Sequence, residues 1–332
     1  ICVLYFINFK NIAQSQSSEL FSENLNLTAK ISLDFKELYK GTNDSTFIKS
    51  KMVFSGNGLE EDSMTVRIRV RGNFRKKICY FKPMRIEIRK KQAENTIFKN
   101  NRKLKLVVPC QNEKGKDELI YKELLAYKFF EEVSDVHLKT QPLTLKIIEK
   151  KGNKEIEHTM FAFLIEDDNK VAKRHDIKKF PKRRVSPLIV SDSSAINFAL
   201  FSYMIGNTDW SMAYQHNTEM FFNGKKLVAI PYDFDHSGLV NAYYAKPNPM
   251  LKISSVRERV YRGLCKRDPE VFSGMRDLYL SKEENIYNTL NAYEDNFNEK
   301  EFNRLNTYIK SFFDIMRSES EFKDKILSKC RG

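Results

Sequence analysis

The chain has 332 residues, of which 41% are hydrophobic and 12% aromatic, so it can bury a sizeable core and wholesale disorder is excluded. Its 12 glycines and 9 prolines exclude collagen-like and low-complexity classes. The 57 Lys and Arg residues outnumber the 43 Asp and Glu residues, giving a formal net charge of +14 that favours anionic partners: nucleotide phosphates, nucleic acid or anionic membrane surfaces.

The first nine residues form a short apolar run, and small and polar residues follow around Ala13. This pattern predicts that residues 1–16 are a truncated signal-peptide-like segment and that 17–30 are a polar linker. The protein is therefore expected to be exported, to the periplasm, the cell surface or the medium. A buried N-terminal strand is the alternative interpretation. No segment reaches the length of a membrane span, so no span is predicted.

The chain contains five cysteines. If Cys2 leaves with a signal peptide, four remain, and an even number suits an exported protein with disulfides. Cys79 could pair with Cys110, and Cys265 could pair with Cys330. Free buried thiols fit the sequence equally well, so the connectivity stays open.

Residues 31–165 are predicted to form a β-rich N-terminal region, because apolar residues alternate with charged ones along several segments. Val66, Ile68 and Val70, for example, alternate with three arginines. The predicted elements are strands at 65–71, 82–90 and 103–108, a helix at 118–133, and a hairpin of strands 143–149 and 158–165.

A basic hinge or linker is predicted over 166–187, with eight Lys and Arg residues between Lys170 and Arg184 and one acid, Asp176. Such a run is either solvated surface or a holding site for an acidic substrate beside a cleft. Nucleic-acid binding is disfavoured, because single-strand binders interleave aromatic residues with their cations and only Phe180 is present here.

Residues 188–332 are predicted to be mainly helical. One helix runs from a cap at Ser191–Asp192 to Met204, and amphipathic helices fill about 254–330. Between them, strands 218–222 and 226–230 are joined by Asn223–Gly224, a strong signal for a tight hairpin.

Polar residues gather at both ends of this hairpin. Asn217 leads into its first strand, Asp233 and Asp235 leave its second strand, and Asp209 lies in the preceding loop. Because a hairpin brings its open ends together, we expect Asn217 beside Asp233, with Asp209 nearby. Amide and carboxylate oxygens suit Mg²⁺ or Mn²⁺ carrying phosphates, and a further carboxylate could orient or deprotonate a hydroxyl. The alternative is ordinary turn chemistry, which Asn and Asp also favour.

This order of residues resembles the catalytic core of protein kinases, and it resembles most closely the CotH kinase family of exported or coat-associated proteins. Two upstream strings, RVRGN at 69–73 and KPMRI at 82–86, resemble that family's RxRGN and KPxRI strands. The resemblance covers about residues 66–240. The chain departs from typical protein kinases because it has no HRD motif and no Gly-rich phosphate loop.

The resemblance implies an α+β fold of two lobes, protein-kinase-like, with a β-rich N-terminal lobe and a mainly helical C-terminal lobe. It implies Mg²⁺- or Mn²⁺- and ATP-dependent phosphoryl transfer to a protein or other hydroxyl acceptor. The implied site consists of Asp209 as catalytic base, Asn217, Asp233 and Asp235 as metal ligands, Lys82 on the nucleotide phosphates, Glu123 as its partner, Arg71 as a phosphate contact, and Glu166 in a hinge beside the adenine. For Arg71, a solvated strand face is an equal alternative.

The alternative function is that of a non-catalytic exported or surface binding protein that retains a kinase-like fold. The scarcity of ATP outside the cytoplasm favours this alternative.

Overall fold

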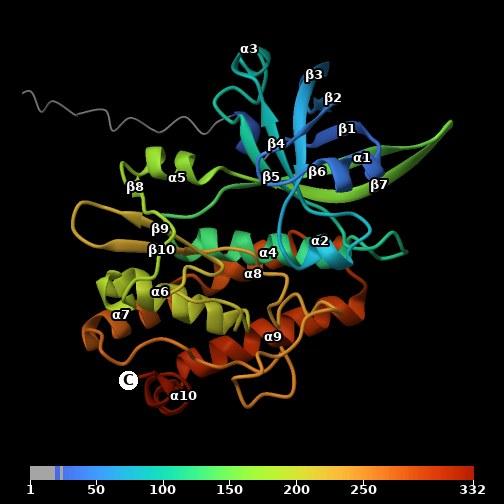
Figure 1. Cartoon of the computed structure of the whole chain (residues 1–332). Helices are drawn as coiled ribbons and strands as arrows, with labels where there is room; N and C mark the ends of the chain where they lie inside the picture. The colour runs from blue at the N-terminus through green and yellow to red at the C-terminus, as the bar shows by residue number, and fades with distance from the viewer. Residues whose placement is uncertain (1–18, 23–24) are drawn as a thin grey trace, which may run out of the picture.

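The computed structural model describes residues 19–22 and 25–332, and Figure 1 shows a β-barrel packed above a group of helices. Seven strands close the barrel in the order β1-β2-β3-β4-β5-β7-β6. Their bounds are β1 Leu27–Leu33, β2 Ile48–Gly56, β3 Leu59–Val70, β4 Met84–Ile88, β5 Lys103–Val107, β6 Thr140–Lys151 and β7 Lys154–Ile165. The strands predicted in this region are confirmed. Short helices lie between the strands: α1 Phe35–Gly41, α2 Arg75–Ile78 and α3 Lys90–Ala93.

The first strand closes the barrel. β1 pairs antiparallel with β2 on one side and parallel with β6 on the other, over the register Leu27↔Leu143 to Leu33↔Glu149. Alternate residues of β1 are buried, as are Val66, Ile68 and Val70 of β3. Side chains on the inner face of every strand therefore share one apolar core inside the barrel.

The prediction of a two-lobed protein-kinase-like fold is wrong, because the N-terminal strands form a closed barrel and not an open β-rich lobe. The closing strand β1 begins at Leu27, inside the segment 17–30 that was expected to be a polar linker, although apolar and polar residues alternate from Leu27 to Leu33. Its parallel partner β6 lies more than a hundred residues away in the chain. The pattern of apolar residues predicts individual strands, but it does not predict which strands pair when they lie far apart in the chain. The closure of the barrel therefore could not be predicted from the sequence.

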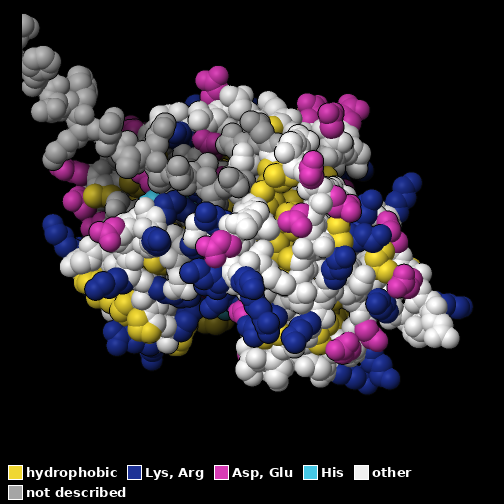
Figure 2. All heavy atoms as spheres, turned by 90° about the horizontal axis from the view of Figure 1, so that it is seen from above, with side chains coloured by type: hydrophobic (Ala, Val, Ile, Leu, Met, Phe, Trp, Pro, Cys, Tyr) yellow, Lys and Arg dark blue, Asp and Glu magenta, His cyan; other side chains and the backbone are white. Residues whose placement is uncertain are grey.

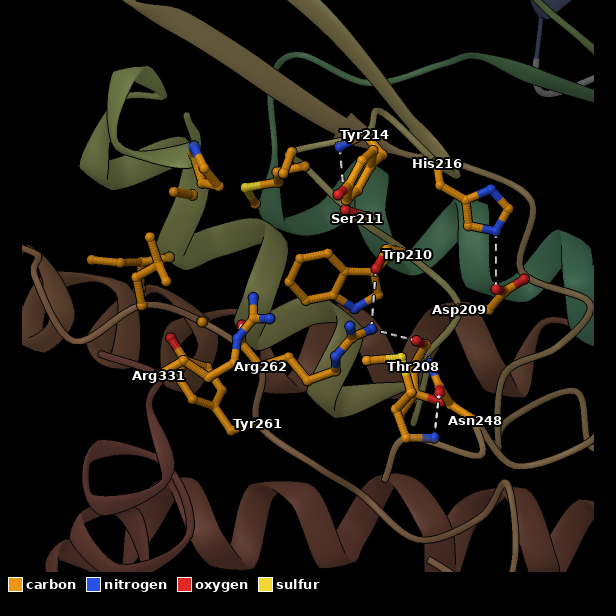
Figure 3. A pocket seen from close by; sticks show the side chains of 18 of the residues that line it. Thr208, Asp209, Trp210, Ser211, Tyr214, His216, Asn248, Tyr261, Arg262 and Arg331 are labelled. Atoms are coloured by element: carbon orange, nitrogen blue, oxygen red, sulfur yellow. Dashed lines mark hydrogen bonds and ion pairs between the residues drawn. The ribbon is translucent and has the colours of Figure 1, made fainter. Parts of the chain in front are cut away.

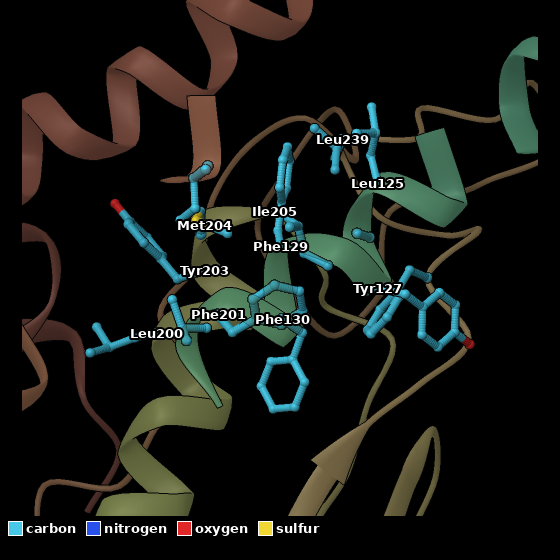
Figure 4. Close-up of a cluster of buried hydrophobic side chains, with 14 of the residues drawn as sticks. Leu125, Tyr127, Phe129, Phe130, Leu200, Phe201, Tyr203, Met204, Ile205 and Leu239 are labelled. Carbon is cyan, nitrogen blue, oxygen red and sulfur yellow. The ribbon is translucent and has the colours of Figure 1, made fainter. Parts of the chain in front are cut away.

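Most of the remaining helices lie below the barrel (Figure 1). The longer ones are α4 Glu118–Val133, α6 Asp192–Met204, α7 Pro269–Ser281, α8 Glu283–Asn291 and α9 Glu299–Arg317, with the shorter α5 Asp168–Arg174 and α10 Glu319–Lys325. The predicted helix at 118–133 and the predicted helix that ends at Met204 are confirmed. Figure 4 shows side chains of α4 and α6 meeting, among them Phe130 and Phe201, whose ring centroids are 4.8 Å apart. This shared core holds α4 against both the barrel and the lower helices.

The predicted hairpin is confirmed as β9 Thr218–Phe222 and β10 Leu227–Pro231, paired in antiparallel register from Phe222↔Leu227 to Thr218↔Pro231. A two-residue strand from the basic run, β8 Lys178–Lys179, pairs with the outer edge of β9. The small sheet therefore ties the basic run to the hairpin.

Two disulfides settle the cysteine connectivity for the described residues. Cys79 is bonded to Cys110 and Cys265 to Cys330. The first joins the segment before β4 to the loop after β5. The second fastens the last residues of the sequence to the segment that precedes α7. Both close loops in the chain and therefore reduce the entropy of its unfolded state.

The surplus of positive charge is visible on the upper face, where Lys and Arg side chains gather (Figure 2). The lining of a pocket of about 320 Å³ beside α3 and α5 includes two acids, Glu94 and Asp167, and the cations Lys90, Lys99, Arg102, Lys103 and Lys170. Among residues 19–22 and 25–332, no helix combines the length and the apolar character needed to cross a bilayer. The predicted signal-like segment 1–16, and with it Cys2, lies outside the described residues.

Candidate functional site

A cleft of about 250 Å³ lies between the barrel, α4 and the open end of the β9–β10 hairpin. Six of the eight site residues predicted from the sequence line it: Arg71, Glu123, Asp209, Asn217, Asp233 and Asp235. They come from the end of β3, from α4, and from the chain on either side of the hairpin. The tertiary structure thus brings together residues as distant in the sequence as Arg71 and Asp235.

The hairpin brings Asn217 and Asp233 to the cleft. Beyond the last ladder pair, the Tyr232 N–H donates a 3.2 Å hydrogen bond to the Asn217 carbonyl oxygen. Asn217 and Asp233 then adopt left-handed backbone conformations, with φ of 47° and 65°. Asn and Asp tolerate this conformation better than other non-glycine residues. The two residues can therefore leave the strands at the mouth of the cleft without a glycine.

Buried aromatic rings fix the exit of β10. Phe234 lies between Asp233 and Asp235, is fully buried, and packs 4.6 Å from Tyr127 and 5.5 Å from Phe201 between ring centroids. The hydroxyl of Tyr127 also accepts a 3.0 Å hydrogen bond from the Asp233 N–H. The backbone that presents the two carboxylates is therefore anchored to α4 and α6.

Asp209 is held by a network of hydrogen bonds. Its N–H donates to Asn207 Oδ1 over 2.9 Å, Oδ1 lies 3.0 Å from His216 Nε2, and Oδ2 accepts from Asn217 Nδ2 over 3.0 Å. Burial alone would raise the pKa of Asp209, but the hydrogen bond and charge of His216, with a hydrogen bond from Asn217, bring it below its usual range. Asp209 is therefore ionised at neutral pH. Because the side-chain nitrogen of Asn217 donates to Asp209, the side-chain oxygen of Asn217 is the atom that can accept a hydrogen bond or coordinate a metal ion.

The loop that carries Asp209 starts at a tight contact. Gly206 follows α6 with φ of 64°, and its carbonyl accepts a 3.1 Å hydrogen bond from the Gly238 N–H. A Cβ at position 206 would overlap the Tyr308 hydroxyl. Only glycine fits here, and the contact joins the Asp209 loop to the chain that leaves the hairpin.

The hydrogen bond to Asp209 and the charges of Asp209 and Asp233 outweigh burial and raise the pKa of His216 above its ordinary value of about 6.5. The charged His216–Asp209 pair is thus complete below the raised pKa and is lost as the pH rises through it. We expect Asp209→Asn to lower the pKa of His216 toward the ordinary value, as measured by NMR titration of the imidazole signals. His137, whose pKa burial lowers, serves as the control and should not move. A His216 pKa that is the same in parent and variant would contradict the assignment.

Glu123 pairs with a cation other than the expected one. Its carboxylate lies 3.5 Å from the guanidinium of Arg75, and both side chains are buried, at 2% and 7% exposure. The Lys82 ammonium instead lies 4.3 Å from the centre of the Tyr39 ring. The expected pair of Lys82 and Glu123 is therefore replaced by Arg75 and Glu123, and Lys82 is not among the described residues that line the cleft.

Three carboxylates surround Arg75. Burial raises the pKa of Glu123, Arg75 opposes the rise, and the charges of Asp235 and Asp233 add to it. Burial, and then the charge of Asp233, also raise the pKa of Asp235, whose Oδ2 accepts a 3.1 Å hydrogen bond from the Tyr244 hydroxyl. Carboxylates that raise one another's pKa mark a place where one more positive charge would be stabilised.

A divalent ion fits this donor set only in part. Within the described part of the chain, no group of three or more His, Cys, Asp and Glu side chains is arranged to hold a metal ion. The amide of Asn217 with the carboxylates of Asp233 and Asp235 is a set of hard oxygens, however. Mg²⁺ is commonly held by one or two carboxylates together with substrate phosphates and water. The residues therefore suit an ion that arrives with a nucleotide better than a permanent metal centre.

Glu166 is engaged away from the cleft. Its two oxygens accept hydrogen bonds of 2.5 and 2.6 Å from Arg174 Nη1, and Oε2 also accepts from the Lys139 N–H over 3.1 Å. Arg71 lines the cleft and holds its place through an N–H that donates to the Pro83 carbonyl over 2.9 Å. Of these two predicted contacts, only Arg71 is positioned to meet a ligand in the cleft.

Two cations near the site had no clear sequence signal. Arg75 belongs to a single-turn helix, which has too few residues to show periodicity. Lys105 belongs to a correctly predicted strand, but its 3.0 Å ion pair with Asp168 and its position 4.8 Å from the Tyr232 ring depend on α5 and the hairpin. An alternating pattern identifies the face of a strand, not the partner opposite it.

Comparisons of the chain with models of protein families, with curated proteins and with solved structures found no match.

Proposed function

We propose that this chain transfers a phosphoryl group from ATP to a hydroxyl acceptor, with Mg²⁺ or Mn²⁺ as cofactor. The supporting observation is the meeting of Asp209, Asn217 and Asp233 in one cleft, two of them at the open ends of a single hairpin. Phosphoryl transfer needs little covalent chemistry from a protein, but it needs positioning and charge neutralisation.

Each residue has a role that its surroundings favour. Asp209 is ionised and held through both oxygens, so it can orient the acceptor hydroxyl and take up its proton. Asn217 and Asp233, with Asp235 behind them, would hold the metal ion, which when bound supplies positive charge to the phosphates. Arg71 provides a guanidinium at the wall of the cleft, a group that binds phosphate oxygens in pairs.

Thermal unfolding with ATP and metal tests the proposal. A ligand that binds only the folded state stabilises it by about 2.7 kcal/mol at a hundred times its Kd. We expect the unfolding temperature of the parent to rise only when ATP and Mg²⁺ or Mn²⁺ are both present. Asp233→Ala should lose the shift, because its carboxylate is a proposed ligand. Asp62→Ala removes an exposed carboxylate on β3 and should keep it. No shift in the parent would overturn the proposal.

A non-catalytic exported binding protein is the second candidate. The two disulfides favour it, because disulfides persist in oxidising compartments outside the cytoplasm, where ATP is scarce. In that case the cleft would bind its ligand without any dependence on nucleotide and metal together. The thermal experiment separates the two candidates, since only phosphoryl transfer requires nucleotide and metal together.

A further inference from the structure

A second pocket, of about 530 Å³, adjoins the cleft and shares Asp209 and His216 with it. Figure 3 shows this pocket, with the Asp209–His216 pair on one side and Trp210, Arg262 and Arg331 together on the other. We call it the Trp210 pocket; it is lined by Asp209, Trp210, Tyr214, His216, Arg262 and Arg331, among others. The Asp209 carboxylate thus lines both the cleft and the Trp210 pocket.

The Trp210 pocket is positively charged. The guanidinium of Arg262 lies 5.0 Å, and that of Arg331 6.0 Å, from the centre of the Trp210 ring. Among the described residues that line the pocket, Asp209 is the one acid, and it is already bonded to His216. No ion pair within the described residues joins Arg262 or Arg331 to a carboxylate. An incoming anion would therefore meet two guanidinium groups that no acidic side chain neutralises.

Arg267 lines the same pocket, but its guanidinium is already neutralised by a carboxylate. It forms a 2.7 Å ion pair with Asp192 and donates to backbone carbonyls. Arg262 also donates to the backbone, to the carbonyls of Thr208 and Trp210. That contact places its guanidinium next to the residue before and the residue after Asp209.

The positive surface extends past the pocket. The guanidinium of Arg184, from the basic run, lies 5.3 Å from the centre of the Tyr214 ring, and that ring is 65% exposed at the rim. Met250, also at the rim, is 89% exposed. A strip of cations interrupted by exposed apolar side chains suits an acidic peptide segment better than one small metabolite.

We propose that the Trp210 pocket is the acceptor site of the transfer proposed above, on which this assignment rests, and that it takes a serine or threonine flanked by acidic residues. The hydroxyl lies at Asp209, and the flanking carboxylates lie at Arg262, Arg331 and Arg184. In the transfer, the bond between the terminal phosphorus of ATP and its bridging oxygen breaks. A new bond forms from that phosphorus to the acceptor oxygen, the hydroxyl proton passes to Asp209, and ADP leaves.

The single tryptophan of the chain gives a direct test that needs neither nucleotide nor turnover. A serine peptide flanked by glutamates is titrated into the full chain while tryptophan emission is recorded, and the same peptide with glutamines is the comparison. We expect a saturable change with the glutamate peptide that weakens as salt is added, and none with the glutamine peptide.

Arg331→Met is the main variant. The side chain of Arg262 holds the Asp209 loop through two backbone carbonyls, whereas Arg331 donates from Nε to the Arg262 carbonyl over 2.7 Å. Loss of one charged hydrogen-bonding partner should raise the Kd of the glutamate peptide about tenfold. Lys225→Met removes an exposed cation in the hairpin turn and should leave the Kd unchanged. Equal binding of the two peptides, or an unchanged Kd in Arg331→Met, would overturn the assignment. Arginine-dependent peptide binding without any effect of ATP and metal on unfolding would overturn the phosphoryl transfer but leave an acidic-peptide site.

Discussion

Asp209→Asn is expected to lower the rate of phosphoryl transfer by about 10²- to 10⁴-fold, the range that a positioned general base contributes. The amide cannot accept the proton of the acceptor hydroxyl, although it has the same shape as the carboxylate. The rate is measured as ADP release in the presence of the glutamate-flanked serine peptide. Affinity for Mg²⁺-ATP should stay close to that of the parent, because Asp209 is not a proposed ligand of the metal or the nucleotide.

Calorimetry with Mg²⁺-ATP separates this effect from loss of the site. Asp233→Ala should abolish binding, whereas Asp209→Asn should retain it. Asp62→Asn, on the exposed part of β3, is the matched control and should retain both binding and rate. A parent-like rate in Asp209→Asn would show that another group receives the proton.

Arg75→Met is expected to lower the free energy of unfolding by about 3–5 kcal/mol, the usual cost of breaking a buried ion pair by removing one partner. Glu123 would stay buried beside Asp233 and Asp235, whose charges already raise its pKa. The loss should be smaller at acidic pH. At acidic pH Glu123 is protonated in both the folded and the unfolded states. At higher pH Glu123 is ionised in the unfolded state, so the folding free energy of the variant includes the cost of keeping this carboxyl neutral in the folded state. Urea unfolding under non-reducing conditions at two pH values measures both effects.

Two further variants make this expectation specific. Arg75→Met with Glu123→Gln removes the carboxyl that folding must keep neutral and should recover part of the loss. Arg67→Met breaks an ion pair with Glu87 on the outer surface of the barrel, where such pairs contribute about 0–1 kcal/mol. If Arg75→Met is no more destabilising than Arg67→Met, the Arg75–Glu123 pair does not contribute to stability as a buried ion pair should.

Local patterns in the sequence determined much of the secondary structure and the outline of the site. The helix at 118–133 has the bounds that its apolar face predicts, and the hairpin follows from Asn223–Gly224 between two apolar runs. The hairpin also explains why Asn217 and Asp233 could be placed together, since a short antiparallel turn leaves its two ends no other arrangement. These features depend on interactions between residues close in the chain, which is why one sequence was enough to predict them.

Only the tertiary structure decided how the barrel closes and which cation meets Glu123. β1 pairs with β6 across more than a hundred residues, and Arg75 reaches Glu123 because α2 lies against α4 below the barrel. The disulfide partners and the Arg174 that binds Glu166 were settled in the same way. Each contact joins side chains that hydrophobic periodicity cannot connect. Periodicity records which face of an element is buried, and the identity of the partner depends on how the whole chain packs.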